Sequence, residues 1–245
     1  MKAPSWSIWI GFDPREAAAF AVCRHSIRRR TFAPIPVHGL VLSELRQKGL
    51  YYRPTERRGE QLWDVISDAP MSTEFSVSRF LTPLVAGSGW AVFMDCDMMV
   101  RANLQRMFEQ LDPSKAVYCV KHKHEPPPGV KMDGQQQTQY TRKNWSSFVV
   151  YNCDHPSNKK LTVGMVNTVP GRDLHRFCWL KDRDIGALSP EYNYLVGTTK
   201  LPRGKEPAVV HWTEGLPMMR GYEDTEYASE FWAELEDCFG SKAAA

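Results

Sequence analysis

The sequence lacks a dominant charge, a long apolar run and any close pair of cysteines. Its 31 Lys and Arg nearly balance 28 Asp and Glu, so the net charge of +3 is too mild to indicate a nucleic-acid partner. No stretch approaches the roughly 18 apolar residues of a membrane span, and the early run 8–12 is shorter than a signal-peptide core of about 7–15 residues. The six cysteines contain no C-x-x-C pair, which argues against a zinc ribbon or a thioredoxin motif. We therefore expect a reduced cytoplasmic protein with no transmembrane segment.

Three enzyme motifs are also missing. The chain has no G-x-G-x-x-G dinucleotide fingerprint and no G-x-x-x-x-G-K-[ST] phosphate loop. It has no G-x-S-x-G nucleophile elbow either. These absences argue against a dinucleotide-dependent oxidoreductase, a P-loop nucleotidase and a serine hydrolase of the α/β type.

The order of apolar segments is typical of an α/β layer fold. With 42% hydrophobic and 24% charged residues, the 245-residue chain has the composition of an ordinary globular protein. Alternating strand and helix patterns favour one α/β domain over 1–239, with 240–245 as a flexible tail or an artificial appendage. Strands are expected at 7–12, 35–42, 90–94, 116–120, 147–152 and 208–211, and helices at 13–30, 72–86, from 103, at 173–180 and at 222–237.

Two segments do not fit this alternation. The segment 46–68 carries several charges and few apolar repeats, so it is predicted to be a surface excursion. The segment 122–142 contains three consecutive prolines and several glycines, and a long insert of this kind is usually a functional loop or disordered. We interpret it as a candidate lid or acceptor-recognition element. Within 72–86, Pro83 is expected to kink or end the helix.

The most specific chemical feature is Asp95-Cys96-Asp97, directly after the apolar strand 90–94. Ligands of open α/β sheets bind beyond the carboxyl ends of strands, where two carboxylates two positions apart can approach one cation. Hard cations such as Mg²⁺ and Mn²⁺ prefer oxygen ligands and often bridge to phosphates. The alternative interpretation is an exposed turn in which one aspartate caps the next segment.

Two further strand ends carry candidate residues. His211 follows the short apolar strand at 208–211, but a lone histidine there is more often structural unless the carboxylates lie nearby. Gly11, Phe12 and Asp13 form the first strand-to-helix turn, where a glycine lets a ligand approach the backbone and a helix N-terminus favours anions. An N-cap role explains Asp13 equally well.

Together these segments resemble the nucleotide-sugar-dependent glycosyltransferases of GT-A fold, most closely the family 8 type, and more narrowly a bacterial and phage group of such proteins. The resemblance implies a mixed central sheet flanked by helices, and it covers about 7–227. It rests on the segments 10–16 (IGFDPRE), 78–81 (SRFL), 93–98 (FMDCDM), 142–147 (RKNWSS) and 210–215 (VHWTEG).

The resemblance implies a donor site with a metal. In it, Asp95, Asp97 and His211 would hold Mn²⁺ or Mg²⁺ against the diphosphate of a nucleotide sugar, most simply a UDP-sugar. A diphosphate leaves poorly unless a Lewis acid neutralises its developing charge. The remaining residues that the resemblance places at the donor are Gly11, Phe12, Asp13, Arg79, Cys96, Gly215 and Arg220, of which Arg220 stands in for a missing lysine.

Asp173 matches the first acid of an Asp-Gln-Asp motif that holds the donor sugar in family 8, and its spacing to the segment 188–193 (LSPEYN) supports the match. Asp173 is therefore our candidate catalytic residue. Leu174 and His175 replace the other two motif residues, and a leucine cannot assist at the reacting face. Family 8 enzymes retain the anomeric configuration, so retention is the expected outcome. The resemblance therefore predicts hexose transfer to an acceptor hydroxyl.

Two other functions stay open at this stage. The altered motif is compatible with a non-catalytic module that binds nucleotide sugars or glycans. A nucleotidyltransferase also pairs carboxylates around a metal, but it needs a phosphate loop that this chain lacks. The acceptor can be a glycan, a lipid, a protein or a modified nucleic acid, and the oligomeric state is not readable from the sequence.

Overall fold

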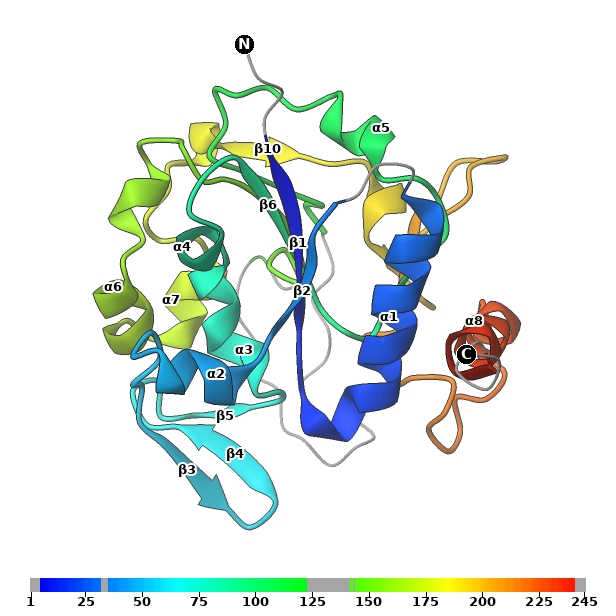
Figure 1. Ribbon diagram of the computed structural model, residues 1–245, viewed down its shortest axis with the longest axis horizontal. Coiled ribbons are helices and arrows are strands. Elements are labelled where there is room, and N and C mark those ends of the chain that lie inside the picture. Colours follow the sequence, from blue (N-terminus) through cyan, green and yellow to red (C-terminus); the bar gives the residue numbers. More distant parts are fainter. Residues whose placement is uncertain (1–4, 32–34, 123–141, 143, 241–245) are drawn as a thin grey trace.

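A six-stranded mixed sheet forms the centre of the computed structural model, which describes residues 5–31, 35–122, 142 and 144–240 (Figure 1). The strand order is β10-β8-β9-β6-β1-β2. Strand β1 (Trp6–Gly11) runs parallel to both β2 (Val37–Leu40) and β6 (Trp90–Met94). Strand β9 (Phe148–Asn152) runs antiparallel to β6 and to β8 (Val117–Cys119), and β8 pairs in parallel with β10 (Ile185–Ala187). The predicted mixed α/β sheet is confirmed.

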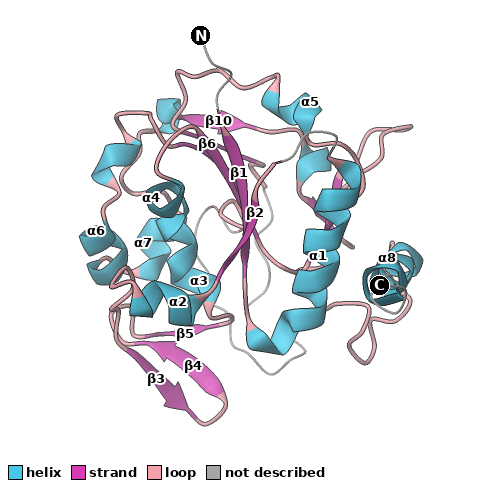
Figure 2. Ribbon diagram, viewed as in Figure 1, coloured by secondary structure: helices cyan, strands magenta, loops and turns pink. Residues whose placement is uncertain are grey.

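Burial explains why these segments form the core. Every residue of β6, β8 and β9 is buried, as expected for strands covered on both faces. Helix α1 (Ala17–Arg30) covers one face, and α4 (Thr82–Ala86) and α7 (Gly171–His175) lie on the other side (Figures 1 and 2). The first helix begins as predicted, because the Asp13 side chain caps the short turn 14–16 that leads into α1.

A second, three-stranded sheet brings distant parts of the chain to the end of β6. It contains β7 (Met98–Val100), β11 (Tyr194–Leu195) and β12 (Val209–His211). Strand β7 starts directly after Asp97 and pairs antiparallel with β12, so that His211 lies opposite Met98. This register places the only histidine of β12 beside the Asp-Cys-Asp turn.

The predicted surface excursion at 46–68 is wrong in part. The segment contributes to a three-stranded antiparallel sheet formed by β3 (Thr55–Arg58), β4 (Gln61–Asp64) and β5 (Ala69–Met71). Arg53 and Asp64 are both buried and form a bidentate ion pair, with two N–O distances of 2.6 Å. Only β3 is as exposed as its charges suggest.

Several helix boundaries differ from the prediction. The segment 72–86 forms α3 (Phe75–Ser78), a 3-10 turn at Arg79–Leu81, and α4; Pro83 lies in the first turn of α4, where no backbone donor is needed. Helix α7 stops at His175, short of Leu180. The last helix, α8 (Ala228–Gly240), begins six residues later than expected and contains the first residue of the predicted tail. The rest of that tail, 241–245, lies outside the described residues.

The remaining helices are short: α2 (Leu42–Gln47), α5 (Gln105–Phe108) and α6 (Val163–Thr168), with 3-10 turns at Asn158–Lys160, Asp182–Asp184 and Pro190–Tyr192. Within the described ranges, the chain has no helix with the length and apolarity needed to cross a bilayer. Of the predicted lid, only His122 and Arg142 are described, so the interpretation of 122–142 lies outside the described residues.

Candidate metal and donor site

Asp95, Asp97 and His211 converge at the carboxyl end of β6. One ligand atom from each residue lies within 4.8 Å of the other two, and His211 Nε2 is 3.2 Å from Asp97 Oδ1. His211 therefore lies close to the two carboxylates, which the sequence alone left open. Asp95 and Asp97 are partly exposed, whereas His211 is buried.

This donor set suits one small divalent cation. Carboxylate oxygens are preferred by Mg²⁺, and an added imidazole nitrogen is compatible with Mn²⁺. Ligands about 2.1 Å from one ion lie at most about 4.2 Å apart, so the 4.8 Å cluster needs only a small inward movement of its side chains.

Arg79 is the buried cation of the site. Its Nη1 lies 2.9 Å from Asp95 Oδ1 and donates to the carbonyl of Ser146 at 3.0 Å. The guanidinium also packs over the rings of Phe75 and Phe93, with its central carbon 5.4 and 5.0 Å from their centroids. The predicted basic residue therefore stands beside a candidate metal ligand, and its direction is set by two aromatic rings and a carbonyl.

The structure gives Gly11 a reason different from ligand access. A Cβ on Gly11 would lie 2.5 Å from the ring of Phe75, so the glycine is small because that ring packs on its backbone. Phe12 is half-buried and contacts Phe20 edge-on. This packing explains the small residue, and the approach of a ligand to the Gly11 backbone stays a prediction.

Asp13 is almost fully buried and has its own local partners. Its carboxylate accepts from the backbone N–H of Arg15 at 2.9 Å and of Glu74 at 3.0 Å, and it pairs with the Arg15 guanidinium. Burial alone would raise the pKa of Asp13, but these hydrogen bonds and the cation hold the pKa below its usual value. The capping alternative for Asp13 is thereby confirmed.

We predict that Gly11→Ala weakens the donor site through Phe75. The new methyl group would push the Phe75 ring, on which Arg79 rests, and overpacking of this kind costs about 1–3 kcal/mol. We expect a lower melting temperature and weaker binding of UDP in calorimetric titrations. Gly164→Ala is the control, because the nearest atom to its Cβ is 3.7 Å away. Wild-type UDP affinity in Gly11→Ala would contradict this coupling.

Cys96 is buried between the two aspartates. Its thiol lies 3.0 Å from the carboxylate of Glu16. Burial, followed by the charges of Glu16 and Asp97, raises the pKa of the Cys96 thiol well above its usual value. Burial and these charges therefore favour the protonated thiol.

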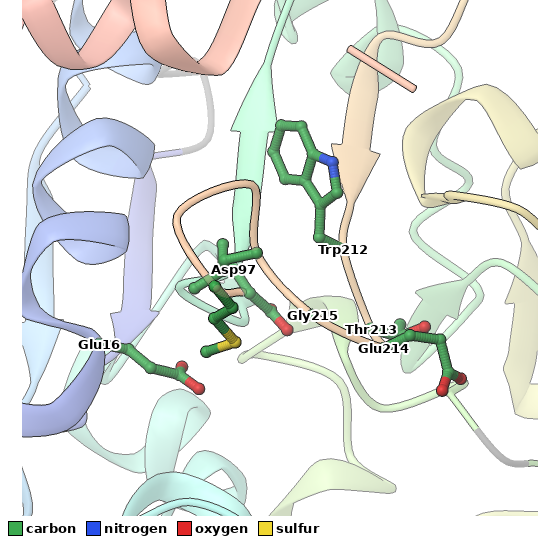
Figure 3. A pocket seen from close by; sticks show the side chains of 8 residues that line it. Glu16, Asp97, Trp212, Thr213, Glu214 and Gly215 are labelled. Carbon is green, nitrogen blue, oxygen red and sulfur yellow. The ribbon is translucent and has the colours of Figure 1, made fainter. Parts of the chain in front are cut away.

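A pocket opens beside Asp97, between the start of the first helix and the loop after β12 (Figure 3). Gly215 belongs to this loop, and a Cβ there would lie 2.6 Å from the ring of Tyr222, so its small size also serves packing. Arg220 is exposed further along the same loop. The pocket is lined by Glu16, Asp97, Trp212, Thr213, Glu214, Gly215, Leu216 and Met219.

Asp173 lies on α7 and forms an ion pair with Arg176. Helix α7 reaches the site through a different residue: His175 Nδ1 is 2.6 Å from Ser146 Oγ, and the Ser146 carbonyl accepts from Arg79. Leu174, at the altered motif position, is fully buried. The contact that joins α7 to the cluster is therefore made by His175, at the third position of the altered motif.

Sequence reasoning missed the residues behind the cluster. Asn193 Oδ1 lies 2.8 Å from His211 Nδ1, and Asn193 Nδ2 donates to Ser147 Oγ at 2.9 Å. Glu16 looked like an ordinary helix-start acid, although its carboxylate contacts Cys96. Only the short segment 188–193 gave a signal, as a spacing match in the resemblance, and nothing in the sequence marked the role of Asn193.

Solved glycosyltransferase structures share this fold. The bifunctional glycosyltransferase WbbM, in its apo form, superposes with a TM-score of 0.63 and 14% identity over 95% of this chain. An active-site mutant of LgtC superposes with a TM-score of 0.59 and 14% identity, covering 94% of this chain and 95% of that one. The chain spans only 50% of WbbM. The architecture is therefore that of GT-A glycosyltransferases.

Sequence comparison gives the family. No family model matches the chain. The chain is 42% identical over 234 residues to Protein CDI of Arabidopsis thaliana. The aligned residues cover 94% of this chain and 86% of Protein CDI. It belongs to the same family as Protein CDI. Because this relative is a plant protein, the narrower bacterial and phage grouping stays a prediction.

Proposed function

We propose that the protein is a metal-dependent glycosyltransferase of the family 8 type. It moves a hexose from a nucleotide sugar, most simply a UDP-sugar, to an acceptor hydroxyl with retention. The observation that carries this proposal is the Asp95–Asp97–His211 cluster beside buried Arg79, at the carboxyl end of the central strand of a GT-A fold. Ligands of open α/β sheets bind at this end.

In this proposal the residues of the cluster bind a cation, and Arg79 faces the donor phosphates. Asp95, Asp97 and His211 hold Mn²⁺ or Mg²⁺, and a cation there supplies the Lewis acidity that stabilises a departing diphosphate. Arg79 presents a fixed positive charge beside Asp95. Because Phe75 and Phe93 already hold its guanidinium, that charge needs little reorganisation when negative charge develops on a phosphate oxygen.

The other donor contacts follow the resemblance. Phe12 and the backbone of Gly11, Asp13 and Cys96 receive the base and ribose, since the side chains of Asp13 and Cys96 already have partners. Arg220 and the backbone of Gly215 approach the phosphates from the loop after β12. Asp173 contacts the transferred sugar, and the acceptor is a hydroxyl of a glycan, lipid, protein or modified nucleic acid.

One observation favours a second candidate, a non-catalytic binder of nucleotide sugars. Leu174 is fully buried where the family 8 motif has a glutamine, so this position offers no polar group to a reacting sugar. A binder would share the metal and the nucleotide site but would not turn the donor over.

A nucleotide-release assay separates these functions. The wild-type protein is incubated with a panel of UDP-, GDP-, CDP- and ADP-sugars in Mn²⁺ or in EDTA. We expect slow release from one donor class in Mn²⁺ and none in EDTA. Metal-dependent thermal stabilisation by UDP without release would favour the binder. If no donor is turned over and no nucleotide stabilises the protein, both proposed functions are contradicted.

A further inference from the structure

We propose that Asn193 is a positioning residue that fixes the tautomer of His211, so that the metal-facing nitrogen Nε2 carries a lone pair. This inference rests on the proposed metal site and deepens it. Asn193 is completely buried, in the turn between the 3-10 turn 190–192 and β11. It touches no substrate, so its role is exerted through His211.

The hydrogen bonds of Ser147 determine the orientation of the Asn193 amide. The Ser147 hydroxyl donates its single proton to the carbonyl of Asn144 at 2.7 Å. Its oxygen must therefore accept from Asn193, whose Nδ2 lies 2.9 Å away. The amide nitrogen of Asn193 faces Ser147, and its oxygen faces His211.

The orientation of Asn193 then determines the proton on His211. An amide oxygen only accepts, so His211 Nδ1, at 2.8 Å, must carry the hydrogen of that bond. In a neutral imidazole the other nitrogen, Nε2, is then unprotonated. That nitrogen lies 3.2 Å from Asp97 Oδ1, so a lone pair and a carboxylate converge as ligands of a cation.

The same buried bonds join His211 to the segment that carries Asp95. The carbonyl of Ser147 accepts from the backbone N–H of Asp95 at 3.0 Å, while its hydroxyl accepts from Asn193. A continuous path thus runs from Asp95 through Ser147 and Asn193 to His211. Some residues hydrogen-bond to a metal ligand and fix its tautomer and direction. Mutation of such a residue typically lowers metal affinity by about 10–100-fold.

Two substitutions separate the parts of this role. Asn193→Leu is close in size and removes both bonds, so His211 can adopt either tautomer. Asn193→Asp keeps an acceptor for Nδ1–H, loses the donor to Ser147 and adds a negative charge beside His211. Asn158→Leu is the matched control, because Asn158 is also a buried asparagine bonded to carbonyls, but at the opposite end of β9, near Asn152.

The experiment measures Mn²⁺ binding by electron paramagnetic resonance in all four proteins. Long-range proton–nitrogen NMR reports the His211 tautomer in the metal-free wild type, at a pH where the imidazole is neutral, with His211→Gln used for assignment. We expect an Nδ1–H tautomer and a Kd for Mn²⁺ raised about 10-fold or more by Asn193→Leu. Asn193→Asp should raise it less, and Asn158→Leu should leave it unchanged.

Two results would overturn the role of Asn193 alone: Mn²⁺ affinity unchanged in Asn193→Leu, or an Nε2–H tautomer in the wild type. If Asn158→Leu weakens Mn²⁺ binding as much as Asn193→Leu, the effect is general destabilisation and the proposal also fails. A wild-type protein that binds no Mn²⁺ overturns the proposed metal site and the role of Asn193 with it.

Discussion

Asp97→Asn is expected to lower metal-dependent nucleotide release by about 100-fold or more, which corresponds to roughly 2.7 kcal/mol of transition-state stabilisation. The amide keeps the size of the side chain but removes the charge that faces His211 and a bound cation. The rate is measured with the donor that the wild-type protein uses, at saturating Mn²⁺. Circular dichroism and the melting temperature should stay close to those of the wild type.

The control for this variant is Asp224→Asn, an exposed aspartate in the loop before α8. It makes the same chemical change away from the cluster and should release nucleotide at the wild-type rate. If Asp97→Asn releases nucleotide within about threefold of the wild type, Asp97 does not hold a catalytic cation. Equal loss in both variants would indicate a nonspecific effect of charge.

Arg53→Met is expected to lower the free energy of unfolding by about 3–5 kcal/mol, the cost of leaving one partner of a buried ion pair alone. The Arg53 side chain is fully buried, and it donates to the carbonyls of Val166 and Val169 as well as to Asp64. Methionine fills most of the volume but satisfies none of these acceptors. Urea unfolding measures the change.

Two further variants test the cause of this loss. Arg58→Met removes an arginine whose ion pairs are solvent-exposed, so its cost should stay below about 1 kcal/mol. Arg53→Met combined with Asp64→Leu should recover part of the lost stability, because no buried charge is left unpaired. An Arg53→Met protein within about 1 kcal/mol of the wild type would show that the pair does not hold the β3–β5 sheet to the core.

The sequence predicted those features that depend on local patterns. The central strand was recognisable because 90–94 is apolar throughout, and the first helix because Asp13 and Pro14 supply a cap and a fixed backbone angle. The cluster was predictable in part. The Asp-Cys-Asp turn was recognisable because it follows an apolar strand, whereas His211 ends a strand of the second sheet, and only the resemblance placed it with the aspartates.

The features that sequence reasoning missed depend on contacts between distant residues. The packing role of Gly11 was missed because nothing near it in the chain reveals Phe75, which is 64 positions away. The segment 46–68 looked like a loop because β3 is charged, and the pairing of Arg53 with Asp64 becomes visible only once the strands fold back. Asn193 has no local pattern that marks it.

Calorimetric titration of the wild-type protein with UDP tests the central claim most directly, because binding of the nucleotide diphosphate needs neither the correct sugar nor an acceptor. The same titration is run in Mn²⁺ and in EDTA, with GDP, CDP and ADP as comparisons. We predict that one of these nucleotides, with UDP as the expected one, binds in Mn²⁺ and binds at least about 10-fold more weakly in EDTA. This corresponds to a difference of about 1.4 kcal/mol in binding free energy. Binding of equal strength in EDTA, or no binding of any of the four, would contradict a metal-dependent donor site at Asp95, Asp97 and His211.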